Sequence, residues 1–265
     1  MQTPRCGKVH LIGAGPGDPE LLTLRALRAI ESADVIVFDR LVSAEIMALV
    51  PKATRRIDVG KAPHFHAVPQ EEIDALLVDL AVQGLNVARL KGGDPLIFGR
   101  GGEEALALRA AGIEVCCIPG ITAAQGAAAA AGVPLTHRGL ASGVRYVTGH
   151  RARDMALDLD WASLASEETT LVVYMGAASI AEIANQLMAH GLPQSIPVLA
   201  VAHATTPREM RLVSTLSDIA ADTALAGLEA PVLFIIGHVV SLYAGSSASL
   251  SAVLLRETQL DLVDA

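Results

Sequence analysis

The sequence predicts an α/β protein built from two α/β domains. Along the first half, short apolar runs alternate with longer runs of helical periodicity, which is typical of a mainly parallel sheet covered on both faces. A turn-rich connector at 134–143 then precedes a second α/β series. We expect domains at residues 1–138 and 139–245, with 246–265 as a peripheral helix or frayed tail.

The elements of the first domain follow from its hydrophobic pattern. Strands are expected at 9–12, 34–38, 54–59, 86–90 and 114–118, of which the first two are short apolar runs. Helices are expected at 20–33, where leucine or isoleucine recurs at helical spacing, at 43–50, 70–83 and 103–111, and in the alanine-rich stretch after Thr122. Ser43 is the expected N-cap of the second helix, and Gly84 ends the third.

The second domain repeats this alternation with less regular spacing. Strands are expected at 144–148, 170–174, 198–202, 208–215 and 231–236. Helices are expected at 179–190, closed by Gly191, and at 216–228, with Ser217 as the N-cap.

Composition disfavours several classes of protein. A net charge of −8 and an aromatic content of 3% argue against a nucleic-acid binder. The uncharged stretch at 115–136 is rich in alanine and interrupted by glycine and proline, so we expect a buried strand, turn and helix rather than a membrane span. Three cysteines without disulfide spacing suit a reducing, cytoplasmic location. His64 and His66 lack further ligands nearby, so no metal site is predicted.

The glycine-rich segment at 91–104 is the strongest candidate for a ligand site. An apolar run leads into it and a helical run leads out, and such strand-to-helix junctions bind ligands in α/β proteins. Its glycines allow a ligand to approach the backbone closely. Asp94 is expected either to accept hydrogen bonds from a ribose or an ammonium group, or to cap the turn.

Neither glycine motif has the chemistry of a phosphate cradle. In Gly13–Asp18 an aspartate replaces the last glycine of the dinucleotide fingerprint, and Pro16 removes one amide donor. The segment after Lys91 lacks the Gly-Lys-Ser/Thr of a P-loop. These features favour a ligand without phosphate, although a tight strand–helix turn is an alternative explanation for Gly13–Asp18.

Several basic residues fall at or near predicted strand ends and connectors. They are Lys61, Lys91, Arg100, Arg138, Arg151 and Arg153. A polycarboxylate ligand requires several such groups, because Arg–carboxylate pairs fix orientation. The alternative is that most of them are ordinary surface charges.

A series of stretches, in order from about residue 8 to 242, resembles the uroporphyrinogen-III C-methyltransferases, a family of tetrapyrrole methylases. The stretches are 9–24, 39–43, 59–61, 90–104, 119–122, 134–142, 173–176 and 205–208. The resemblance implies two α/β domains with the cofactor in the cleft between them, and a homodimer. It also implies transfer of methyl groups from S-adenosylmethionine to C2 and C7 of uroporphyrinogen III. The product, precorrin-2, is made by way of precorrin-1 and feeds sirohaem, cobalamin and haem d1.

The same resemblance implies roles for particular residues. Cofactor contacts would be Pro16, Gly92, Gly93, Asp94, Ile97, Thr122, Ala123, Met175 and Ala204, the last at a position where the family often has glycine. Asp39 and Lys61 match a proton acceptor and a proton donor. Arg100, Glu103, Arg138 and Met175 match positions around the substrate. Arg100 and Glu103 complete the expected catalytic set with Asp39 and Lys61, and either Asp39 or Glu103 suits proton acceptance.

Two other functions stay open at this level. One is a later precorrin methyltransferase of the same superfamily. The other is a non-catalytic protein that binds the cofactor or a tetrapyrrole.

Overall fold

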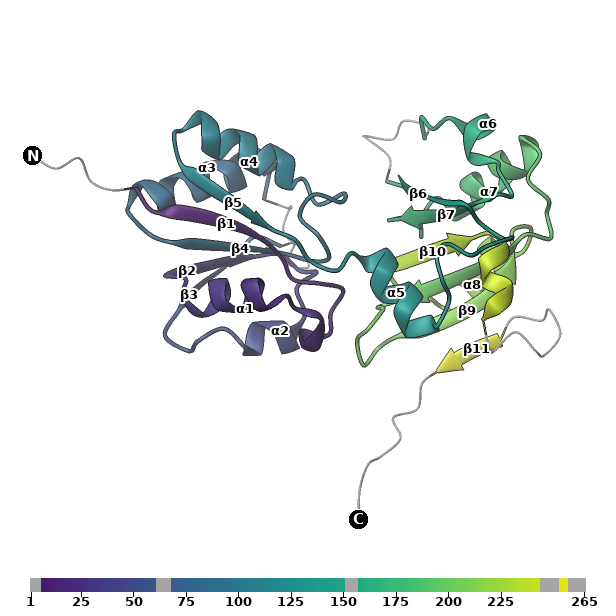
Figure 1. The fold of residues 1–265 in the computed structure, drawn as a ribbon, viewed down its shortest axis with the longest axis horizontal. Helices are drawn as coiled ribbons and strands as arrows, with labels where there is room; N and C mark the ends of the chain where they lie inside the picture. Colours follow the sequence, from purple (N-terminus) through teal and green to yellow (C-terminus); the bar gives the residue numbers. More distant parts are fainter. Residues whose placement is uncertain (1–5, 61–67, 151–156, 244–252, 257–265) are drawn as a thin grey trace, which may run out of the picture. The chain divides into compact units, whose positions relative to one another are not determined.

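A computed structural model describes residues 6–60, 68–150, 157–243 and 253–256 (Figure 1). The chain forms two compact units, Met1–Ala123 and Ala124–Ala265. This division falls at the first residue of the alanine-rich helix, whereas the boundary expected from the sequence follows that helix, at 138/139. The backbone N–H of Ala124 donates to the Tyr174 hydroxyl at 3.2 Å, which ties the start of that helix to the second unit.

The first unit contains a parallel sheet. Its strands are β1 (Lys8–Gly13), β2 (Val35–Phe38), β3 (Arg55–Asp58), β4 (Val87–Lys91) and β5 (Glu114–Ile118), in the order β3-β2-β4-β1-β5. Every pairing between these strands is parallel, as predicted. The helical elements are η1 (Pro19–Leu21), α1 (Leu24–Glu31), α2 (Ala44–Ala48), α3 (Gln70–Val82) and α4 (Gly101–Ala110).

Both faces of this sheet are covered, which explains its nearly continuous apolar strands. Val9 and Leu11 of β1 are buried in the cluster formed with α3 and α4. Ile12 is buried in the cluster formed with α1 and α2 on the other face (Figure 1).

The expected single helix over 20–33 is wrong in its start, because the segment forms two helical elements. Asp18 caps the short η1, and Thr23 then accepts a hydrogen bond from the Ala26 N–H at 3.1 Å and begins α1. Leu24, in the first turn of α1, is 72% exposed, while Ala26 and Ile30 are buried.

The second unit contains a mixed sheet. Its strands are β6 (Gly143–Thr148), β7 (Thr169–Tyr174), β8 (Pro197–Ala202), β9 (Met210–Thr215), β10 (Val232–Ile236) and β11 (Val253–Arg256), in the order β11-β9-β8-β10-β7-β6. β6 and β7 pair in parallel, and the other pairings are antiparallel. The helical elements are α5 (Ala123–Ala131), α6 (Trp161–Leu164), α7 (Ile180–Ala189), α8 (Ile219–Leu225) and η2 (His238–Leu242). The α/β class is confirmed for both units.

Two predictions in this unit need correction. The tail at 246–265 was expected to be a helix or frayed, but Val253–Arg256 forms a strand paired antiparallel with β9. The remaining tail residues lie outside the described part of the chain. Asp218, rather than Ser217, occupies the N-cap position of α8, because the Ser217 hydroxyl lies 2.8 Å from the Thr215 hydroxyl instead.

Candidate active site

Three loops of the first unit meet at the carboxyl edge of its sheet. β4, β1 and β5 are neighbours, so the loops that follow them leave the sheet together. The Gly93 N–H donates to the Gly15 carbonyl at 2.7 Å, and the Gly15 N–H donates to the Gly93 carbonyl at 3.1 Å. The third loop joins them through the Gly120 N–H, which donates to Asp94 Oδ2 at 3.1 Å. The glycine-rich stretches therefore form one structure.

Several amide donors of these loops are used within the loops. The Ala14 N–H donates to the Lys91 carbonyl at 2.8 Å, and the amides of Gly15, Gly93 and Gly120 are engaged as described above. A phosphate site at a helix N-terminus or glycine loop needs amides that point at the ligand. This geometry fits the prediction of a ligand without phosphate.

The carboxylate of Asp94 organises two loops. Its Oδ1 accepts a hydrogen bond from the Leu96 N–H at 2.8 Å, and its Oδ2 accepts the one from Gly120. The turn-capping role is therefore present. Each carboxylate oxygen keeps a further lone pair, so contact of Asp94 with a cofactor stays a prediction.

Gly92 has no room for a side chain. A Cβ at this position would lie 2.7 Å from the Cβ of Leu41, a residue of the loop after β2. Gly93 instead has a positive φ of 68°, which favours glycine, and a Cβ there would lie 3.6 Å from the Ala123 nitrogen. Glycine is therefore required at position 92 by lack of space and favoured at position 93 by the backbone conformation.

We expect Gly92→Ala to destabilise the protein by about 1–3 kcal/mol, because the new methyl group forces Leu41 and its loop to shift. The matched control is Gly102→Ala on α4, where a Cβ meets nothing within 4 Å. That change is expected to be neutral or to stabilise by up to about 1 kcal/mol. Urea denaturation measures both, and equal stabilities of the two variants would contradict the argument.

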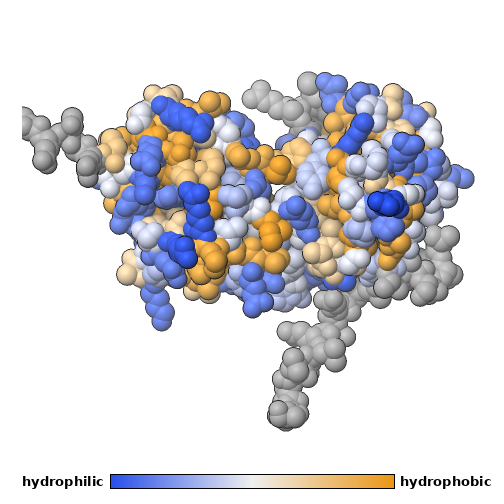
Figure 2. Space-filling view, viewed as in Figure 1, coloured by the Kyte–Doolittle hydropathy of each residue, from blue (hydrophilic) through white to orange (hydrophobic). Residues whose placement is uncertain are grey.

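Apolar side chains around these loops remain exposed. Leu41, Leu96, Ile97 and Phe98 are each at least 36% exposed in the loops after β2 and β4. Figure 2 shows such apolar surface, in orange, among the hydrophilic residues of the first unit. Exposed apolar groups next to ordered polar loops are typical of a ligand site.

A buried cluster of charges lies beneath the loops, in β4 and α4. Glu104 is fully buried, and its Oε1 accepts hydrogen bonds from Lys91 Nζ at 2.7 Å, Arg89 Nε at 3.2 Å and Gln70 Nε2 at 3.3 Å. Its Oε2 is buried and has no hydrogen-bond partner among the described residues. Burial lowers the pKa of Lys91, an effect that the nearby Glu104 carboxylate opposes.

This cluster reaches the predicted proton acceptor. Arg89 Nη2 lies 3.3 Å from Asp39 Oδ2, so the buried Arg89 contacts both Asp39 and Glu104. Asp39 Oδ1 accepts a hydrogen bond from the Leu41 N–H at 3.1 Å. Because the Asp39 side chain is 25% exposed, one end of the cluster is open to a ligand or to water.

Arg100 and Glu103 form an exposed ion pair at the start of α4. Arg100 Nε lies 2.9 Å from Glu103 Oε1, and Arg100 Nη2 lies 2.6 Å from Oε2. Their mutual hydrogen bonds lower the pKa of Glu103 and raise the pKa of Arg100. Glu103 is therefore a weaker base, and Arg100 keeps its charge and can orient a carboxylate.

The predicted residues of the second unit share one edge of its sheet. Met175 follows β7 and Ala204 follows β8, and both strands are antiparallel to β10, which lies between them. The two strands therefore point the same way, about 10 Å apart. Met175 is 49% exposed, so its side chain is available for contact.

Strained backbone marks these same loops. The non-glycine residues with positive φ among those described are Phe98, Arg100, Met175, His203 and Thr205. All of them follow β4, β7 or β8. Left-handed backbone costs a non-glycine residue about 1–3 kcal/mol, and it tends to persist at functional sites. The Thr205 N–H donates to Glu209 Oε2 at 2.5 Å, which helps to hold this loop.

The remaining predicted residues fall into three groups. In the first unit, Pro16 and Ile97 are partly exposed, and Thr122 is buried beside Ala123 at the beginning of α5. In the second unit, Arg138 is exposed at a turn closed by the His137–Ala141 bridge. Lys61 lies outside the described residues, as do His64, His66, Arg151 and Arg153.

Sequence reasoning missed Arg89 and Glu104. Arg89 stands inside a strand predicted to be buried, and that placement was the available signal, because a buried charge needs a partner. Glu104 was hidden by its neighbour Glu103, which carries the family resemblance. The orientation of α4 about its own axis decides that Glu104 is buried and Glu103 is exposed, and the sequence alone does not give that orientation.

Two negative findings apply to the described residues alone. None of their helices combines the length and the apolar character that a bilayer crossing requires. No group of three or more histidine, cysteine, aspartate or glutamate side chains among them is placed to hold a metal ion.

The sequence profile of the tetrapyrrole (corrin/porphyrin) methylases matches residues 8–220. The chain therefore belongs to the tetrapyrrole methylase family. Within that family it is 67% identical to the uroporphyrinogen-III C-methyltransferase of Paracoccus denitrificans, over 89% of this chain and 82% of that protein. The resemblance found in the sequence is confirmed.

Two further comparisons extend this result. The chain is 53% identical to the siroheme synthase of Acinetobacter baylyi over 89% of its own length, but it spans about half of that relative, 51%. The crystal structure of a uroporphyrin-III C-methyltransferase from Thermus thermophilus, in complex with S-adenosylhomocysteine, superposes with a TM-score of 0.78. It is 41% identical, and the match covers 89% of this chain and 100% of that one.

Proposed function

We propose that this protein is an S-adenosylmethionine-dependent C-methyltransferase that methylates uroporphyrinogen III twice, at C2 and C7, to give precorrin-2 by way of precorrin-1. The observation that carries the proposal is the joined set of glycine loops whose amides are already used, in a chain 67% identical to a uroporphyrinogen-III C-methyltransferase. Such loops suit a cationic cofactor without phosphate.

The residues present fit this cofactor. Backbone at Gly92 and Gly93, the carboxylate of Asp94 and the exposed side chain of Ile97 offer polar and apolar contacts in the first unit. Pro16, Thr122, Ala123, Met175 and Ala204 are the other proposed contacts. When bound, the cofactor supplies an electrophilic methyl group on a sulfonium.

Asp39 is the proposed proton acceptor. Methylation of a pyrrole carbon leaves a cationic ring, which must then lose a proton, and a nearby carboxylate stabilises the cation and accepts the proton. Asp39 is held by Arg89 and by the Leu41 N–H, and it remains partly exposed. Glu103 is less suited because Arg100 engages both of its oxygens. Lys61 is the proposed proton donor.

Basic residues are proposed to hold the carboxylates of the substrate. Arg138 is exposed, and no ion pair to it is formed by the described residues. Arg100 presents a charged guanidinium on a strained, ordered loop. Met175 offers an exposed apolar side chain for contact with the substrate. A homodimer and a cytoplasmic location are proposed on the family resemblance alone.

The direct test is to incubate the protein anaerobically with methyl-labelled cofactor and uroporphyrinogen III. A product that carries two labelled methyl groups is expected. Label transfer only to an already methylated precorrin would favour a later corrin-ring methylase instead. Tight cofactor binding without transfer to any tetrapyrrole would indicate a binding protein.

Arg100→Ala is expected to lower methyl transfer by about 100-fold, because positioning of the substrate is lost. The affinity for S-adenosylhomocysteine, measured by calorimetry, should stay close to that of the wild type. Arg109→Ala, an exposed arginine at the other end of α4, is the control and should keep full turnover. Normal turnover in Arg100→Ala would contradict the substrate role.

A further inference from the structure

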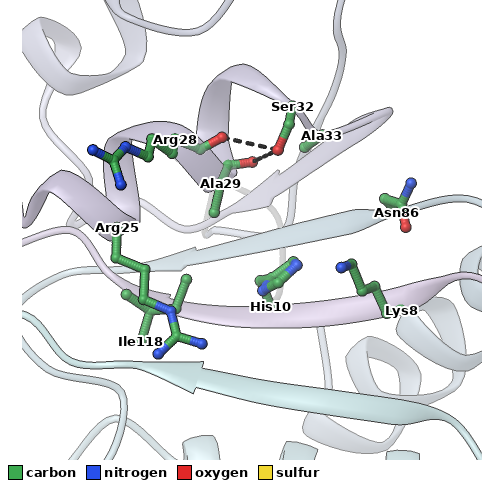
Figure 3. Close-up of a pocket in the computed structure, with 9 residues that line it drawn as sticks. All are labelled: Lys8, His10, Arg25, Arg28, Ala29, Ser32, Ala33, Asn86 and Ile118. Atoms are coloured by element: carbon green, nitrogen blue, oxygen red, sulfur yellow. Dashed lines mark hydrogen bonds between the residues drawn. The ribbon is translucent and has the colours of Figure 1, made fainter.

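A cavity lined by basic residues lies in the first unit. It has a volume of about 370 Å³ and lies between β1 and α1 (Figure 3). Its polar lining comes from Lys8, His10, Arg25, Arg28, Ser32 and Asn86. Figure 3 shows Arg25 reaching from α1 toward β1, with His10 and Lys8 on that strand.

The charged residues at one end of this cavity lie toward the amino ends of the strands. Lys8 begins β1 and Asn86 directly precedes β4, whereas the glycine loops follow the carboxyl ends of both strands. Five residue steps along β1 separate Lys8 from Gly13, which corresponds to about 16 Å. The cavity also reaches Ile118, the last residue of β5, but none of its lining residues belongs to the candidate active site described above.

The lining is positively charged in an acidic protein. The whole chain carries 20 Lys and Arg residues against 28 Asp and Glu residues, yet Lys8, Arg25 and Arg28 line this one cavity without a carboxylate. Among the described residues none of the three has an ion-pair partner. Arg25 Nη2 instead lies 3.0 Å from Cys116 Sγ, a weak acceptor. Unpaired cations around a hollow attract anions.

His10 lies on β1 among these cations. Its Nδ1 is buried and has no hydrogen-bond partner among the described residues, which is uncommon for a buried polar atom. Burial lowers the pKa of His10, and the positive charges of Lys8 and Arg25 lower it further, while Glu114 opposes them. The ring therefore lies in a positive field, and its N–H can donate to an anionic oxygen.

We infer that this cavity binds a small molecule carrying at least two anionic groups, phosphates or carboxylates. The charges on β1 and on α1 approach the cavity from two sides, so two anionic groups on one molecule can be paired at once. Arg25 offers the planar donors that match either kind of group. Ser32 and Asn86 add neutral polar groups at the rim.

Calorimetric titration of the full-length protein at low ionic strength tests the inference, with pyrophosphate, citrate and inorganic phosphate as probes. Saturable binding of pyrophosphate or citrate is expected, tighter than that of inorganic phosphate. Preference for pyrophosphate indicates a phosphate ester as the ligand, and preference for citrate indicates a polycarboxylate. Absence of saturable binding by all three probes would overturn the proposal.

Arg25→Gln and Lys8→Gln should each weaken binding by about tenfold, the usual loss for one charged hydrogen bond. Arg109→Gln removes the same charge from α4 in the same unit, but it does not line the cavity, so it should bind like the wild type. Equal affinity in Arg25→Gln and the wild type would refute the site. Methyl transfer should be unchanged in Arg25→Gln, so this test stands apart from the proposed function.

Discussion

Replacing Glu104 by glutamine is expected to lower the free energy of unfolding by about 3–5 kcal/mol. Glu104 is fully buried, and its Oε1 holds both Arg89 and Lys91, which are also buried. Without its negative charge, these two cations retain Asp39 as their one counter-charge among the described residues. Urea denaturation followed by circular dichroism measures the loss.

The adjacent Glu103 provides the control. It carries the same charge on the same helix, but its side chain is 53% exposed and pairs with an equally exposed arginine. Exposed pairs contribute little, so Glu103→Gln should change stability by less than about 1 kcal/mol. Equal stabilities of the two variants would contradict the claim that the buried Glu104 carboxylate stabilises the fold.

Asp39→Asn is expected to lower the rate of methyl transfer by about 10²- to 10⁴-fold, the range for loss of a positioned proton acceptor. Asparagine keeps the shape and can still accept a hydrogen bond from the Leu41 N–H, so the loop should stay in place. The affinity for S-adenosylhomocysteine should be retained. Single-turnover assays separate the methyl transfer step from binding.

Asp58→Asn is the matched control for this change. Asp58 ends β3 much as Asp39 follows β2, and its carboxylate likewise accepts a hydrogen bond from the N–H two residues on, that of Gly60, at 2.7 Å. Unlike Asp39, it forms no ion pair with the described residues. Turnover near the wild-type rate is expected. A fully active Asp39→Asn variant would remove Asp39 from the proton-accepting role.

β1 and β2 of the first sheet were predictable because they are largely buried and therefore read as apolar runs. The antiparallel pairings of the second sheet were less accessible, since a short apolar run does not reveal the direction of its neighbours. β11 is the clearest case: Val253–Arg256 forms a strand through pairing with β9, more than 35 residues away in the chain.

The candidate site was likewise predictable only in its local features. The loops could be predicted from glycines at strand ends, which is a local signal. The contact of Arg89 with Glu104 depends on how α4 packs over β4, and the connection between Arg89 and Asp39 depends on β2 lying beside β4. Those are tertiary facts, and periodicity within one segment does not contain them.

The left-handed residues have a consequence for the evolution and engineering of this protein. The left-handed backbone conformation is unfavourable for the five non-glycine residues that adopt it, and glycine would adopt it without this cost. These residues are Phe98, Arg100, Met175, His203 and Thr205. A selection for heat resistance alone should therefore enrich glycine at these positions, and a selection for activity should remove it. A comparison of the two selections at each position would show where a lower stability of the fold accompanies a higher activity.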